Sequence, residues 1–118
     1  MSEHPHELPR NDWRPYLQAV TKEHEGDEVT IELVDRELGD EREVERLPLA
    51  YLDYEPGDHA VIVAVGGRDR RYPVVLHHFV DGPHRILADS YEPGPTLALD
   101  IVDDEGDHTI VTLHKPGS

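Results

Sequence analysis

The chain contains no cysteine. This absence excludes disulfide bonds, zinc sites built on thiolates, iron–sulfur clusters and cysteine nucleophiles. The length of 118 residues still suits a single domain, and a chain of this size buries roughly two thirds of the surface that its unfolded form exposes. We therefore expect one hydrophobic core that needs no covalent cross-link.

Long apolar runs are also missing. The longest stretch, residues 60–65, has the length of a β-strand, whereas a membrane span needs roughly 20 apolar residues. Residues 1–7 are polar and acidic, whereas a secretory signal has a basic start and an apolar centre. We therefore expect a cytoplasmic protein without a membrane partner.

Basic residues and side-chain amides are scarce. The chain has 11 Lys and Arg against 26 Asp and Glu, a net charge of −15, and only two Lys, one Asn and one Gln. This charge should repel nucleic acids and anionic membranes. We interpret the composition as a halophile-type surface, which stays soluble at high salt. The alternative is an ordinary acidic protein from a genome rich in G and C.

One helix is predicted near the N-terminus, between a cap at Asn11 or Asp12 and a stop at Gly26. Pro15 falls in its first turn, where the missing N–H has little effect. Apolar side chains spaced by three or four residues form one stripe along this helix: Trp13, Tyr16, Leu17 and Val20.

From residue 28 onward, polar and apolar side chains alternate, which is typical of β-strands with one buried face. No alternation of strands with helices occurs, which excludes a parallel sheet with a dinucleotide fold. We predict a mainly β (α+β) fold, an antiparallel meander sheet or small barrel of 7–8 strands with the N-terminal helix packed on it. The expected strands are residues 28–33, 41–47, 49–54, 59–65, 70–80, 84–90, 97–102 and 108–114. For residues 41–47, a short helix is the alternative.

The expected organisation along the chain is simple. Residues 1–8 should form a disordered arm and residues 9–115 a single globular domain. The Pro-Gly pair in residues 55–58 predicts a type II turn. Residues 103–107 are interpreted as a hairpin turn, because they lack the spacing of a calcium loop. After a turn at residues 81–83, the strand over residues 84–90 is expected to pair with the strand that precedes the turn.

Pro73 indicates an edge position or a bulge for the strand over residues 70–80, because proline removes a ladder hydrogen bond. The one basic cluster of the sequence, residues 68–71, stands at the start of this strand. We interpret the cluster as pairing with the protein's own carboxylates or as protecting an edge strand against aggregation. Binding of a phosphate or of a partner's acidic segment is the alternative.

Short motifs follow one another in a defined order over residues 7–113. They are Leu-Pro-Arg-x-x-Trp at 8–13, Lys-Glu-His-Glu-Gly at 22–26, Leu-Pro-Leu at 47–49, His-x-Val-x-x-Pro at 78–83, Leu-x-Ile at 99–101 and Gly-x-x-Thr at 106–109. In this order the chain resembles the short prokaryotic proteins grouped as domain of unknown function 5335 (DUF5335). The resemblance implies a free-standing cytoplasmic protein of bacteria or archaea, and it implies no activity and no catalytic residues.

Nine histidines raise the question of a metal site, since His is the commonest metal ligand. His77 and His78 are consecutive, so on a strand they point to opposite faces and only one can join a given site. The candidate divalent-metal site is His78 with His84, completed by Asp81. The alternative is that His78 lies at the edge of the core with a hydrogen-bond partner, while His77 is exposed.

A serine nucleophile is hard to assemble from this sequence. Ser90 is the one Ser away from the chain ends, and it lacks the Gly-x-Ser-x-Gly elbow. A triad of Ser90 with His84 or His78 is one interpretation. The simpler interpretation is that Ser90 precedes a turn.

These observations predict a non-enzymatic binding or accessory module, without catalytic residues and without a cofactor. The candidate binding residues are Arg10, Trp13, His77, His78 and His84, and Arg10 can stack on the indole of Trp13. The expected partner is a protein or a small molecule, and the chain is expected to be a monomer or a homodimer. One alternative is a His/carboxylate divalent-metal-binding protein or metal-dependent enzyme centred on His78 and His84. Another is a homo-oligomer built by pairing of edge strands.

Overall fold

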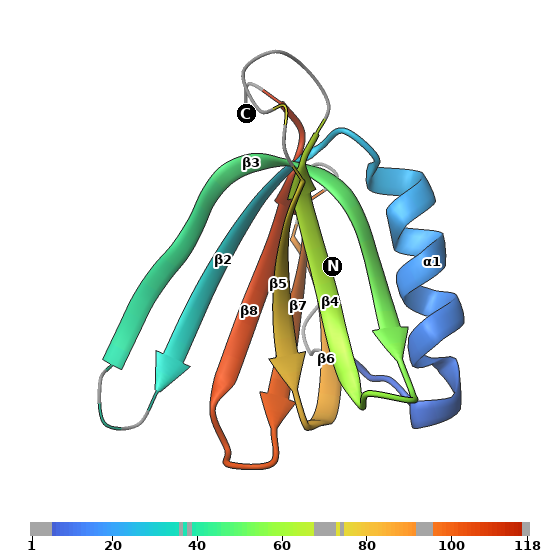
Figure 1. Ribbon diagram of the computed structural model, residues 1–118, viewed down its shortest axis with the longest axis vertical. Helices are drawn as coiled ribbons and strands as arrows, with labels where there is room; N and C mark the ends of the chain where they lie inside the picture. The colour runs from blue at the N-terminus through green and yellow to red at the C-terminus, as the bar shows by residue number, and fades with distance from the viewer. Residues whose placement is uncertain are drawn as a thin grey trace.

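The computed structural model describes residues 6–35, 37, 39–67, 73, 75–91 and 96–116. Its elements are β1 (His6–Glu7), the short 3₁₀ helix η1 (Arg10–Asp12), α1 (Trp13–His24), β2 (Glu28–Asp35), β3 (Gly39–Glu55), β4 (Ala60–Gly66), β5 (Val75–Asp81), β6 (Pro83–Tyr91), β7 (Thr96–Asp103) and β8 (His108–His114). The described strands form one antiparallel sheet in the order β1-β6-β7-β8-β2-β3-β4-β5 (Figure 1). The mainly β fold with an N-terminal helix is confirmed, and the sheet is open, with β1 and β5 as its edges.

The longest strand, β3, folds the sheet over on itself. Its first half pairs with β2, and its second half, from Leu49 onward, pairs with β4. Figure 1 shows β3 arching over the top of the molecule between these two neighbours. The prediction of two separate strands, 41–47 and 49–54, is wrong. Arg46, with φ +55°, and Pro48, which has no N–H, lie at the bend and interrupt the local pattern without ending the strand.

The fold therefore has two layers with the core between them. The first layer holds β1, β6, β7, β8, β2 and the first half of β3, and the second holds the rest of β3, β4 and β5. Along β8, buried and half-buried side chains strictly alternate, which confirms the predicted period of two. The largest core contributions are Val29, Ile31, Ile86, Leu99, Ile101, Val111 and Leu113 from the first layer and Leu49, Leu52, Tyr54, Val61, Val63, Val65 and Val80 from the second.

Helix α1 packs against the second half of β3 (Figure 1). Its predicted apolar stripe is confirmed, because Trp13, Leu17 and Val20 are buried and Tyr16 packs against the core. Gly26, with φ +86°, follows the helix end as expected. Trp13 is only 1% exposed, and its Nε1 donates a hydrogen bond to the carbonyl of Leu8 at 3.0 Å.

A hydroxyl group joins the helix to the strand beneath it. Oγ1 of Thr21 accepts a hydrogen bond from the backbone N–H of Leu52 at 2.8 Å. The same hydroxyl donates to the carbonyl of Leu17 at 2.9 Å or to that of Leu52 at 3.1 Å. Thr21 therefore satisfies backbone groups of β3 on the side that faces the helix.

A buried polar cluster closes the junction between α1 and β2. Nδ1 of His24 hydrogen-bonds to Oδ2 of Asp27 at 2.9 Å, and Nζ of Lys115 lies 3.3 Å from the same oxygen. The backbone carbonyl of Asp27 also accepts from the N–H of Leu49 at 2.8 Å. These contacts tie the helix end to β3 and to the chain that follows β8, which is a structural role.

The chain changes layer between β5 and β6. The expected hairpin between these strands is wrong, because β6 pairs with β7 and β1, whereas β5 pairs with β4. The change occurs at Gly82, whose φ is +63°, and at Pro83, which starts β6. The positive φ of Gly82 is a backbone conformation that glycine adopts without strain, which favours glycine at this change of layer.

The turn between β3 and β4 differs from the predicted type II turn. That turn requires a positive φ at Gly57, but the residue with positive φ is His59, at +51°. Nδ1 of His59 lies 2.9 Å from Oη of Tyr54. This contact supports an unusual backbone conformation for a residue with a side chain.

Two residues of the N-terminal segment form a short strand. His6 and Glu7, which belong to the expected arm over residues 1–8, pair with Ala88 and Leu87 of β6. Within the described part of the chain, no helix has the length and apolar character needed to cross a membrane.

Candidate functional site

Exposed apolar side chains concentrate at one edge of the sheet. Among the described residues, the exposed large hydrophobic side chains are Tyr51 (36% exposed), Val75 (37%), Leu76 (56%) and Phe79 (55%). Three of these belong to β5, and Tyr51 lies two strands away on β3. In a chain of net charge −15, this clustering marks β5 as the candidate site.

The outer face of β5 carries stacked rings. Tyr51 and His77 both pair with Ala64 of β4, and this small residue lets their rings meet at 5.8 Å between centroids. His77 stacks on Phe79 along the strand, with centroids 6.2 Å apart and an angle of 21° between the planes. We call Tyr51, His77 and Phe79 the aromatic row.

The inner face of β5 becomes more exposed toward the start of the strand. Val80 pairs with Val61 and is buried. His78 is half-buried, and Leu76 is exposed. The start of β5 therefore extends beyond the core that the two layers share.

The backbone of β5 is an open edge of the sheet. Among the described strands, β5 pairs only with β4, so every second N–H and C=O of β5 faces away from the sheet. The other edge strand, β1, has two residues, whereas β5 has seven, with no Lys, Arg or Pro among them. Charged residues and proline usually protect such an edge, and in β5 only its last residue, Asp81, is charged. The basic cluster at residues 68–71, predicted to protect it, lies outside the described residues.

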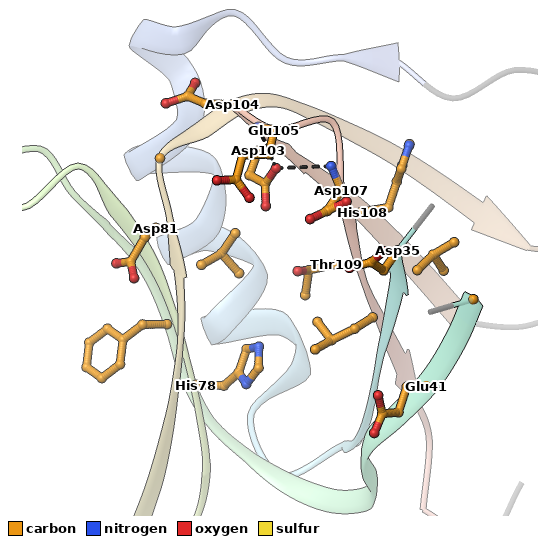
Figure 2. Close-up of a pocket in the computed structure, with 16 residues that line it drawn as sticks. Asp35, Glu41, His78, Asp81, Asp103, Asp104, Glu105, Asp107, His108 and Thr109 are labelled. Carbon is orange, nitrogen blue, oxygen red and sulfur yellow. Dashed lines mark hydrogen bonds between the residues drawn. The ribbon is translucent and has the colours of Figure 1, made fainter. Parts of the chain in front are cut away.

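A pocket of about 500 Å³ opens beside β5 (Figure 2). Its walls come from the end of β5, from the β2–β3 hairpin and from the turn between β7 and β8. Among the described residues that line it, none is Lys or Arg. We call it the acidic pocket, because seven carboxylates line it: Asp35, Glu41, Asp81, Asp103, Asp104, Glu105 and Asp107.

Several of the polar residues around this pocket have structural partners, among them Asp35, whose Oδ1 accepts a hydrogen bond from the backbone N–H of Glu37 at 2.6 Å. Oδ1 of Asp103 accepts hydrogen bonds from the backbone N–H groups of Glu105 at 2.9 Å and Asp107 at 3.0 Å (Figure 2). These bonds confirm the predicted hairpin turn at residues 103–107. His108 is held by the carboxylate of Asp100, at 2.9 Å from Nδ1 to Oδ1.

His78 is the polar residue that β5 contributes to the inside of the pocket. Burial lowers the pKa of its imidazole below the usual 6.5, and the nearby carboxylate of Glu43 partly opposes this effect. The neutral form of His78 is therefore favoured near neutral pH. This position agrees with the alternative in which His78 lies at the edge of the core, while His77 is exposed on the outer face.

The residues of the suggested metal site separate into two places. His78 and Asp81 line the acidic pocket, whereas Nδ1 of His84 lies 4.0 Å from Oδ1 of Asp104. Within the described residues, no group of three or more His, Asp or Glu side chains has an arrangement that could hold a metal ion. Metal binding therefore stays a prediction without a preformed site in its support.

Arg10 and Trp13 lie away from β5 and support the helix. The guanidinium of Arg10 stands over the indole, 4.8 Å from its centroid, as the sequence suggested. The edge of Trp13 also meets the ring of Tyr54, with centroids 5.1 Å apart. We assign both residues to packing.

Sequence reasoning missed the residues that make β5 distinctive. The sequence analysis singled out none of Tyr51, Val75, Leu76 and Phe79, since the pairing register and the packing decide which apolar side chains stay exposed. One signal was available: residues 74–80 carry apolar side chains on both faces, and Pro73 indicated an edge. Together these features are typical of an edge strand with an exposed apolar surface.

The fold and this surface define a small, open, folded-over antiparallel sheet with one covering helix and an exposed apolar edge strand. The chain belongs to the family of unknown function DUF5335, whose model matches residues 4–118. It is similar to an uncharacterized protein of Aquifex aeolicus, with 30% identity over 109 residues, which covers 92% of this chain and 90% of the relative. No solved structure matches the chain.

Proposed function

We propose that this protein is a non-enzymatic binding module of the cytoplasm that holds a protein partner along β5. The observation that carries the proposal is the clustering of the exposed large apolar side chains of the described chain at β5 and Tyr51. Contiguous apolar patches on soluble proteins often mark interaction sites. On the surface of a chain with a net charge of −15, an exposed apolar patch is less expected than on the surface of an average soluble protein.

The mode of binding follows from the edge position of β5. An extended segment can add to an exposed sheet edge, where main-chain hydrogen bonds supply affinity and alternate side chains supply specificity. Seven residues of β5 offer that ladder, and the aromatic row offers rings on its outer face. The proposal therefore assigns binding to β5 and to the row beside it.

Site-specific photo-crosslinking tests this proposal. A photo-reactive phenylalanine analogue placed at Phe79, in cells of the organism that encodes the chain, should crosslink a discrete protein partner that mass spectrometry identifies. The matched control carries the analogue at Glu23, an exposed position on α1. If both positions give the same products, or position 79 gives none, the proposal is wrong.

The metal-binding alternative has its own test. Protein purified without a tag should contain no stoichiometric divalent metal, because the described histidines form no ligand cluster. One equivalent of zinc or nickel, lost in His78→Gln, would favour a metal-binding protein instead.

A further inference from the structure

We infer, resting on the proposed function, that the partner of β5 is an extended cationic segment. This segment would pair with the open edge of β5 and place Arg or Lys side chains in the acidic pocket. The inference depends on two features, the apolar edge strand β5 and the acidic pocket. β5 forms one wall of that pocket.

The edge and the pocket are contiguous. His78, Phe79, Val80 and Asp81, the second half of β5, form one wall of the acidic pocket. The opposite walls belong to the first layer, on the β2–β3 hairpin and the β7–β8 turn. A strand that pairs with β5 must therefore run past the mouth of the pocket.

Charge decides between the possible occupants of this edge. A second copy of the chain would bring another net charge of −15 toward the first, and such repulsion opposes association at moderate salt. A cationic segment is instead attracted, and among the described residues that line the pocket seven carboxylates are accompanied by no Lys or Arg. The neutral imidazole of His78 adds no positive charge to this lining. Carboxylates bind guanidinium groups through paired, charge-assisted hydrogen bonds.

The geometry of a strand specifies the pattern of the partner. Successive side chains on an added strand point to opposite faces of the sheet. Those on the outer face would lie beside Val75, His77 and Phe79, which favours apolar residues there. Those on the inner face would lie beside His78 and Val80, at the pocket, which favours Arg or Lys. We therefore expect apolar and basic residues to alternate in the partner.

Synthetic peptides of about eight residues, the length of one strand, test this inference. The probe alternates Val and Arg, a neutral peptide alternates Val and Thr, and a third peptide has the composition of the probe with its Val and Arg residues in separate blocks. Fluorescence anisotropy with the full chain should show that the alternating Val/Arg peptide binds at least about tenfold more tightly than the other two.

Paired variants separate the pocket from the overall charge. Asp107→Asn combined with Glu41→Gln should weaken binding of the Val/Arg probe about tenfold, a loss of about 1.4 kcal/mol. Asp58→Asn combined with Glu23→Gln removes the same charge from exposed positions outside the pocket and should leave binding nearly unchanged. Phe79→Ser should also weaken binding, and circular dichroism should show that this exposed substitution leaves the fold intact.

Several results would overturn the inference. Equal binding of the neutral peptide would remove the cationic partner and leave the proposed function standing. Equal binding of the block peptide, or equal losses in the two double variants, would show non-specific attraction only. A dimer in light scattering that Phe79→Ser dissociates would make a second copy the occupant. A failed crosslink at position 79, in contrast, counts against the proposed function itself.

Discussion

At the scale of single residues, His78 is the position where the core, the edge strand and the acidic pocket meet. Its register opposite Val63 turns the imidazole toward the facing layer, and burial lowers its pKa. The sequence predicted the division of roles between His77 and His78, because neighbours on a strand point to opposite faces. It could not predict which acidic groups would gather near His78, since Glu43 and Asp35 come from other strands.

The lowered pKa of His78 predicts an acid-sensitive part of the stability. As the pH falls through 6.5, the usual value, toward the lowered value of the folded state, the unfolded chain takes up the proton first. The free energy of unfolding should therefore fall over this window. His78→Gln should show a smaller loss than the wild type when urea unfolding is compared at about pH 7.5 and about pH 5.

The control for this experiment is His84→Gln, because the side chain of His84 is 64% exposed. This variant should retain the acid-induced loss of the wild type. If His78→Gln loses as much stability as the wild type over the same window, burial of His78 does not set that part of the pH dependence.

At the scale of elements, the joint between α1 and β3 shows what local patterns can and cannot predict. The helix was predictable, because Trp13, Leu17 and Val20 recur at helical spacing within a few residues. The bond from the N–H of Leu52 to Thr21 joins residues 31 positions apart. No local pattern marks Thr21 as the partner of that strand.

Thr21→Val tests this joint with almost no change in volume. The substitution removes the acceptor of the Leu52 N–H, and an unsatisfied buried donor destabilises a fold by about 1–3 kcal/mol. We expect a loss of this size in the free energy of unfolding measured by urea denaturation. Thr21→Ser keeps the hydroxyl and should lose less. A Thr21→Val protein as stable as the wild type would show that the bond contributes nothing net.

At the scale of the whole molecule, charge and packing oppose each other. The excess of carboxylates that gives the net charge of −15 causes mutual repulsion. Folding brings seven of these carboxylates together around one pocket. The composition predicted the overall repulsion. It did not predict the pocket, because that cluster depends on how the two hairpins and β5 meet in space.

Salt should stabilise this molecule through screening. The halophile-type interpretation predicts a clear rise of the melting temperature between about 0.1 M and about 2 M KCl, because the Debye length falls from roughly 10 Å to below 3 Å. Differential scanning fluorimetry across this range measures the effect. A melting temperature that stays constant would contradict the interpretation.

The amino-acid sequence alone determined the local elements: the helix that begins at Trp13 and ends before Gly26, the alternating strands, the hairpin turn at residues 103–107 and the edge that Pro73 indicated. Each depends on the spacing of neighbouring residues, which hydrophobic periodicity and turn chemistry record directly. Only the tertiary structure decided that β3 continues through Pro48 and that β6 pairs with β7 and not with β5. It also decided that β5 contributes both to the aromatic row and to the wall of the acidic pocket. These features depend on pairing and packing between residues far apart in the chain, and no local period encodes such distances.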